Sequence, residues 1–186
     1  MVTIGSLWLA IVLSAVLVWI ASALVWMVLP HHKSEFKGLP DEDSARKALA
    51  PQNLTPGQYN IPHCVSWDEM KQPEAQKRFE QGPVAFITVV PNGAPAMGRN
   101  MILSFIYYLL VGTAVAYVAS RSLASGDDYL SVFRLTGTVA WLAYGAALIP
   151  DAIWFGRPWN TVAKHLIDAF VYGLLTAGVF GWLWAN

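Results

Sequence analysis

Over most of its length the sequence has very little charge. Charged residues make up 13% of the chain, whereas a soluble domain usually carries roughly a quarter. With 55% hydrophobic residues and a mean hydropathy of +0.43, such a chain would not remain soluble as a monomer, and we expect a lipid bilayer to surround it. Outside 30–99 the charged residues are only Arg121, Asp127, Asp128, Arg134, Asp151, Arg157, Lys164 and Asp168.

Other scarcities exclude whole classes of function. A single cysteine excludes a disulfide within the chain. The net charge of zero gives no basic surface for nucleic acid, which we do not expect as a partner. The sequence has no Walker loop, no GxGxxG after a strand, no GxSxG and no HExxH, and these are the motifs that mark common nucleotide, hydrolase and zinc-protease sites. We therefore predict no cofactor and no catalytic residues.

Four apolar runs are long enough to cross a membrane, for which about 20 residues are needed. They cover 7–29, 101–120, 130–149 and 166–184. No Lys or Arg precedes Lys33, so the first run lacks the positive start of a cleaved signal peptide. The sequence predicts an all-α membrane protein: transmembrane helix 1 in 1–29, a polar insert in 30–100, and a three-helix transmembrane segment in 101–186.

The polar insert is expected to be small and mostly helical. The pattern at 41–49 favours a helix, and Ser66 with Glu69 forms the spacing of a capping box. Pro73 predicts a break and a second helix start. The apolar, β-branched run 84–90 is typical of a strand, and its best partner is the short extended piece 58–61. The sequence therefore predicts a two-stranded ribbon inside the insert.

Basic residues near the spans predict the orientation. Lys33, Lys37, Arg99, Arg157 and Lys164 fall on the side of the insert, whereas the other side has only two arginines, Arg121 and Arg134. By the positive-inside rule, the insert 30–100 is cytoplasmic and both termini lie outside.

Arg134, Asp168 and Asp151 are the candidate polar residues within or beside the spans, where ionisable groups are costly and often functional. Antiparallel helices would hold Arg134 and Asp168 about 15–20 Å apart along the membrane normal, so we expect no ion pair between them. The simpler interpretation is that Arg134 reaches the headgroups and Asp168 caps its helix beside Lys164. The alternative is a proton or ion path.

Three histidines and the cysteine are weak candidates for a metal or catalytic site. Zinc sites use three or four ligands, often separated by two to four residues. Here the candidates are adjacent pairs, and neighbouring side chains tend to diverge. We therefore predict no metal site, while keeping His31, His32, His63 and Cys64 as candidates.

Small residues recur at helical spacing in the last span, where Gly173, Ala177 and Gly181 form a flat stripe. In membranes, helices associate through close approach at small residues. The stripe predicts packing within the bundle, and the alternative is an interface between copies in a homo-oligomer.

Several stretches resemble a family of uncharacterised bacterial inner-membrane proteins. They are HHKSEFKGLPDED at 31–43, PGQY at 56–59, PHC at 62–64, FRLTGTVA at 133–140 and GVFGWLW at 178–184. The resemblance implies a location in the bacterial plasma membrane and implies no activity.

The sequence favours a non-enzymatic accessory or scaffold subunit that engages a protein partner through its insert. This expectation follows from a bundle nearly free of catalytic groups that is joined to a capped insert without motifs. Two alternatives stay open. One is a small oligomeric transporter or channel-like protein that uses the intramembrane polar residues, and the other is an interfacial enzyme or metal-binding protein that uses the histidines and Cys64.

Overall fold

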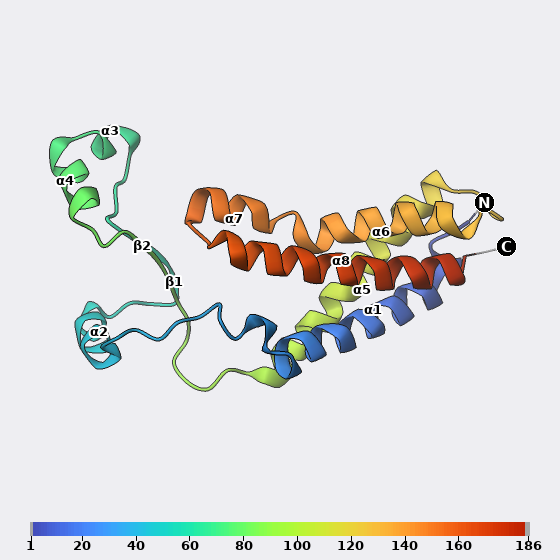
Figure 1. The fold of residues 1–186 in the computed structure, drawn as a ribbon, viewed down its shortest axis with the longest axis horizontal. Helices are drawn as coiled ribbons and strands as arrows, with labels where there is room; N and C mark the ends of the chain where they lie inside the picture. Colours follow the sequence, from blue (N-terminus) through green and yellow to red (C-terminus); the bar gives the residue numbers. More distant parts are fainter. Residues whose placement is uncertain (1, 185–186) are drawn as a thin grey trace. The chain divides into compact units, whose positions relative to one another are not determined.

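The computed structural model describes residues 2–184, which are mostly helical (Figure 1). The chain divides into two compact units. The first is a helical bundle made by the described parts of Met1–Phe36 and Ala96–Asn186, and the second is the insert Lys37–Pro95.

Four helical segments of the bundle are long and apolar enough to span a membrane, which confirms the prediction of a multi-pass membrane protein. They are Gly5–Val28, Met97–Ser122, Tyr129–Phe155 and Trp159–Trp182. All four begin before the apolar run that predicted them. Polar residues in the first turns, such as Arg99 and Asn100 of the second span, are helical, and hydropathy alone does not detect these turns.

The first span changes its helical form as it ends. It consists of a 3₁₀ turn at Gly5–Leu7, helix α1 at Trp8–Ala23 and a π-helical turn at Leu24–Val28. Leu29 is extended, and a 3₁₀ turn follows at Pro30–His32. Proline suits the first position of such a turn because its missing N–H would have no partner there. The chain thus bends where it leaves the bundle.

The third span is broken near its end, which the sequence did not predict. Helix α6 covers Tyr129–Gly145, and α7 follows at Leu148–Phe155. Pro150 lies in the first turn of α7, where a helix tolerates proline. Gly156 ends α7 with a left-handed φ of +67°, as is common after a helix.

Helices α6 and α8 (Trp159–Trp182) pack closely along their length, as Figure 1 shows. A Cβ atom added to Gly173 would lie 3.2 Å from the carbonyl oxygen of Gly137, and one added to Gly137 would lie 3.0 Å from the Cβ of Ala177. A Cβ at Gly181 would lie 2.7 Å from the ring of Tyr129. The stripe of small residues on α8 therefore lies against α6 of the same chain.

The remaining contacts close the bundle. Helix α1 packs against α8 and against α5 (Met97–Ser122), and Gly112 of α5 faces the carbonyl oxygen of Ile11. The buried hydroxyls of Thr136 and Thr176 donate to carbonyl oxygens of their own helices, so they need no partner from another helix. The core includes Leu7, Ala10, Val111, Val115, Val132, Ala140, Val179 and Phe180.

The insert contains three short helices and a two-stranded sheet. Helix α2 is Glu42–Leu49, α3 is Trp67–Met70 and α4 is Pro73–Gln81. The predicted cap at Ser66 is confirmed, because the Glu69 amide donates to Ser66 Oγ. The Glu69 carboxylate also reaches back as predicted, but it accepts from the amide of Val65, one residue before the cap. The ribbon is confirmed too: β1 (Gly57–Ile61) pairs antiparallel with β2 (Ala85–Val89).

Asp128 caps the start of α6 and provides a pH-dependent test of the bundle. Hydrogen bonds from the hydroxyl and amide of Ser131 hold the pKa of Asp128 below its usual 3.8, and the Leu130 amide and the charge of Arg134 act in the same direction. Because the pKa of Asp128 is lower in the folded than in the unfolded chain, its ionised carboxylate stabilises the fold at pH values above the unfolded-state pKa. This stabilisation is lost as the pH falls through the folded-state pKa.

We therefore expect Asp128→Ala to lower the thermal unfolding temperature in detergent at pH 7, and to lower it less as the pH falls below about 3.8. Circular dichroism at pH 7, 5 and 3 measures the difference. Asp128→Asn keeps an acceptor for the cap but has no charge, so its difference from the Asp128→Ala protein should not vary with pH. If Asp128→Ala lowers the unfolding temperature by the same amount at pH 7, 5 and 3, the charge of Asp128 does not stabilise the start of α6.

Candidate metal centre

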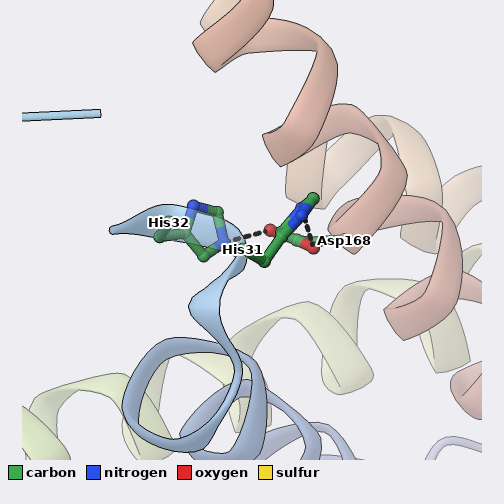
Figure 2. A group of neighbouring side chains, drawn as sticks. All are labelled: His31, His32 and Asp168. Atoms are coloured by element: carbon green, nitrogen blue, oxygen red, sulfur yellow. Dashed lines mark hydrogen bonds and ion pairs between the residues drawn. The ribbon is translucent and has the colours of Figure 1, made fainter. Parts of the chain in front are cut away.

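The 3₁₀ turn after the first span places two adjacent histidines against α8 (Figure 2). Lys33 and Glu35 donate their amides to the carbonyl oxygens of Pro30 and His32, which keeps the chain tightly turned. The tight turn directs His31 and His32 to the same carboxylate, that of Asp168. Adjacent histidines diverge on an extended strand, but this turn brings both rings to one point.

His32 is the centre of the cluster and is only 6% exposed. Its Nε2 lies 2.7 Å from Asp168 Oδ2, and its Nδ1 lies 2.5 Å from Glu35 Oε1. The ring stacks on Trp26 of the π-helical turn, with centroids 3.8 Å apart and planes 2° from parallel. Stacking and two hydrogen bonds fix the orientation of this imidazole, as expected for a group that must present one nitrogen precisely.

His31 approaches the second oxygen of Asp168. Its Nε2 is 3.4 Å from Asp168 Oδ1 and is buried, yet it makes no hydrogen bond within residues 2–184. Buried polar atoms in native proteins nearly always have a partner. An imidazole nitrogen that is buried beside a carboxylate without a hydrogen bond is well suited to accept a cation.

A second carboxylate supports His32 from the other side. The Glu35 side chain is only 4% exposed, and its Oε2 lies 3.1 Å from His165 Nε2. Burial raises the pKa of Glu35, but the hydrogen bonds and the electrostatic interactions with His32 and His165 outweigh burial, so the pKa lies below 4.5. Glu35 is therefore ionised at neutral pH and is a strong acceptor for the His32 ring.

Lys164 fixes the backbone of the turn to α8. Its Nζ donates to the carbonyl oxygen of His31 at 2.7 Å and to Ser34 Oγ at 2.8 Å. The sequence-based expectation that Asp168 caps its helix beside Lys164 is wrong, because α8 begins at Trp159 and Asp168 lies in its third turn. Lys164 instead binds the chain that carries the histidines.

Two groups of three residues in 2–184 are close enough to hold a metal ion. One is His31, His32 and Asp168, and the other is His32, Glu35 and His165, and in each the ligand atoms lie within 4.8 Å of one another. Ligands on a tetrahedral ion at 2.0–2.1 Å are about 3.3 Å apart. His31 Nε2 and Asp168 Oδ1 already have that separation. The distance between His32 Nε2 and Asp168 Oδ2 would have to increase by about half an ångström.

We favour the first group because of its surroundings. With a cation on His32 Nε2, the neutral ring would keep its proton on Nδ1 and donate it to Glu35. This is the carboxylate–histidine–metal arrangement that orients metal ligands in proteins. The two carboxylates also balance the two charges of a divalent ion.

Comparison with known proteins does not decide the role of this chain. No protein-family model matches it, and neither the curated proteins nor the solved structures contain a significant match. The geometry of the His31, His32, Glu35, His165 and Asp168 cluster is therefore the main evidence on function.

The other sequence candidates lie elsewhere. His63 and Cys64 belong to the insert, where His63 Nδ1 lies 2.8 Å from Asn60 Oδ1, and neither residue is in a group of potential ligands. Arg134 is exposed on α6, and Asp151 of α7 lies 3.8 Å from Arg157. An intramembrane role for Arg134 or Asp151 stays a prediction.

Sequence reasoning missed Glu35 and His165. The signal was present: His165 precedes Asp168 by three residues, as His32 precedes Glu35, and residues three apart share a helix face. His165 was overlooked because it lies inside a helix that hydropathy alone starts at 166. The residues that bring the two elements together cannot be read from local spacing.

Proposed function

We propose that this multi-pass membrane protein binds a divalent transition-metal ion through His31, His32 and Asp168. The observation that carries the proposal is the convergence of both histidines on one buried carboxylate, with His31 Nε2 buried and making no hydrogen bond. Asp168 lies within a candidate membrane span, where ionisable groups are expensive and are retained mainly for function.

Each residue of the cluster has a distinct role. The Nε2 atoms of His31 and His32 and the carboxylate of Asp168 bind the ion directly. Glu35 accepts from His32 Nδ1 and keeps its Nε2 directed at the ion, and His165 holds Glu35. Lys164 anchors the turn through the carbonyl oxygen of His31.

The donor set selects the class of ion. Imidazole suits zinc and the neighbouring first-row metals, whereas magnesium and calcium prefer sites made only of oxygen. Two histidines and one carboxylate leave at least one coordination position for another ligand, which is the pattern of exchangeable or catalytic sites rather than closed structural ones.

An ion in this position would cross-link two parts of the chain that are distant in sequence. It would fix the segment that leaves the first span to the beginning of the last span. This fits the accessory or scaffold role that the sequence favours, in which the ion sets the conformation of the chain entering the insert. Ion transport would require, in addition, a route through the bundle.

The experiment is a direct titration of the purified, chelator-treated protein in detergent with Zn²⁺, followed by isothermal calorimetry and elemental analysis. We expect one Zn²⁺ per chain. His31→Ala should weaken binding at least as much as the roughly 10- to 100-fold that loss of an outer-shell partner costs. His63→Ala, which alters a histidine of the insert, is the matched control and should bind like the wild type.

Two results would overturn the proposal. One is a wild-type protein that binds no Zn²⁺ at micromolar concentration. The other is a His63→Ala protein that loses as much affinity as His31→Ala, since this would place the ion in the insert.

A further inference from the structure

A shallow groove lies between α6 and α8, with a volume of about 190 Å³. Its walls include Phe133, Trp141, Phe170 and Leu174, and its floor lies at Gly137 and Gly173, where the two helices touch. Phe170, Leu174 and Trp141 are exposed at 54%, 41% and 39%. The groove therefore faces outward from two membrane spans, toward lipid.

One end of this groove carries a positive charge. Arg134 lines it and is exposed, and within residues 2–184 it forms no ion pair. Arg134 lies in the second turn of α6, and Trp141 lies two turns deeper, about 10 Å along the helix. An arginine so near the end of a span extends toward the headgroups.

We propose that the groove binds one anionic glycerophospholipid, with an acyl chain against the aromatic walls and the phosphate on Arg134. The guanidinium group matches phosphate through two parallel hydrogen bonds. A second copy of the chain fits less well, because an interface there would bury the charge of Arg134 beside apolar side chains. This lipid site is distinct from the metal centre, because none of the residues that line the groove belongs to the histidine cluster.

Native mass spectrometry of delipidated protein tests the proposal. The protein is mixed with equal amounts of phosphatidylglycerol and phosphatidylcholine that have identical acyl chains. We expect one bound lipid per chain, with phosphatidylglycerol preferred. A basic residue near a membrane surface contributes about 1 kcal/mol toward anionic lipid, so Arg134→Gln should reduce phosphatidylglycerol binding about fivefold.

Two further variants separate charge from shape. Arg121→Gln is the matched control, because Arg121 is an exposed arginine at the end of α5 that lies over Tyr117 and outside the groove; it should leave the preference unchanged. Leu174→Trp fills the groove without altering Arg134, and should reduce the binding of both lipids. Circular dichroism confirms that each variant is folded.

The proposal is overturned if the wild-type protein binds both lipids equally or binds neither. It is also overturned if Arg121→Gln loses as much binding as Arg134→Gln. A lipid-free dimer that Leu174→Trp converts to a monomer would show that a second copy of the chain occupies the groove.

Discussion

Asp168→Asn is expected to lower Zn²⁺ affinity by more than about 100-fold, beyond the range for outer-shell partners. Asparagine keeps the size of the side chain and one oxygen, but it removes the negative charge that two histidines share. The ion would then bind two imidazoles without a negatively charged ligand, at a position where residue 168 is only 7% exposed to solvent. Calorimetric titration in detergent measures the change.

Asp151→Asn is the control for this variant. Asp151 is also an aspartate at the end of a membrane span, but it pairs with Arg157 at 3.8 Å and takes no part in the cluster. Its substitution should leave Zn²⁺ affinity within about twofold, because exposed ion pairs contribute little to stability. If the Asp151 and Asp168 variants bind equally well, Asp168 is not a ligand.

Gly173→Leu is expected to cause the largest loss of stability. A side chain there would meet the carbonyl oxygen of Gly137 at 3.2 Å and the backbone nitrogen of Trp141 at 3.3 Å, and backbone atoms cannot move aside cheaply. Overpacking of this kind typically costs about 1–3 kcal/mol and occasionally more. Thermal unfolding in detergent should show a clear decrease in the transition temperature.

The same helix provides a matched control. A Cβ atom at Gly178 would meet only the hydroxyl of Tyr129, at 3.9 Å, so Gly178→Leu adds the same side chain with far less obstruction. It should unfold within a few degrees of the wild type. If Gly173→Leu and Gly178→Leu unfold at the same temperature, close packing of α6 against α8 at Gly173 does not stabilise the bundle.

The spans were predictable because the signal is strong. Water is absent from the bilayer core, so a spanning segment must satisfy its own backbone groups as a helix and must carry apolar side chains. The ribbon and the capped helices of the insert were predictable from short-range rules, since Ser66, Pro73 and the apolar strand residues act on their neighbours. Element boundaries were less predictable, because the first turns of α8 include Asn160, Lys164 and His165, which are helical but lower the local hydropathy.

The candidate metal centre was not predictable by the same means. Spacing rules treat His31 and His32 as adjacent side chains that diverge, whereas the 3₁₀ turn after Pro30 brings both to Asp168. This convergence depends on how the first span packs against α8, at a separation of more than one hundred residues. Local periodicity contains no information about that contact. The prediction that the bundle holds few functional groups therefore overlooked the cluster of His31, His32 and Asp168.

X-ray absorption at the zinc edge of the loaded, detergent-purified protein tests the central claim most directly. Coordination by His31, His32 and Asp168 predicts a first shell of nitrogen and oxygen only, at about 2.0–2.1 Å, with the outer scattering of two imidazole rings. A sulfur neighbour at about 2.3 Å would instead place the ion on Cys64. A first shell of oxygen alone, without imidazole scattering, would equally contradict a metal centre built on the two histidines.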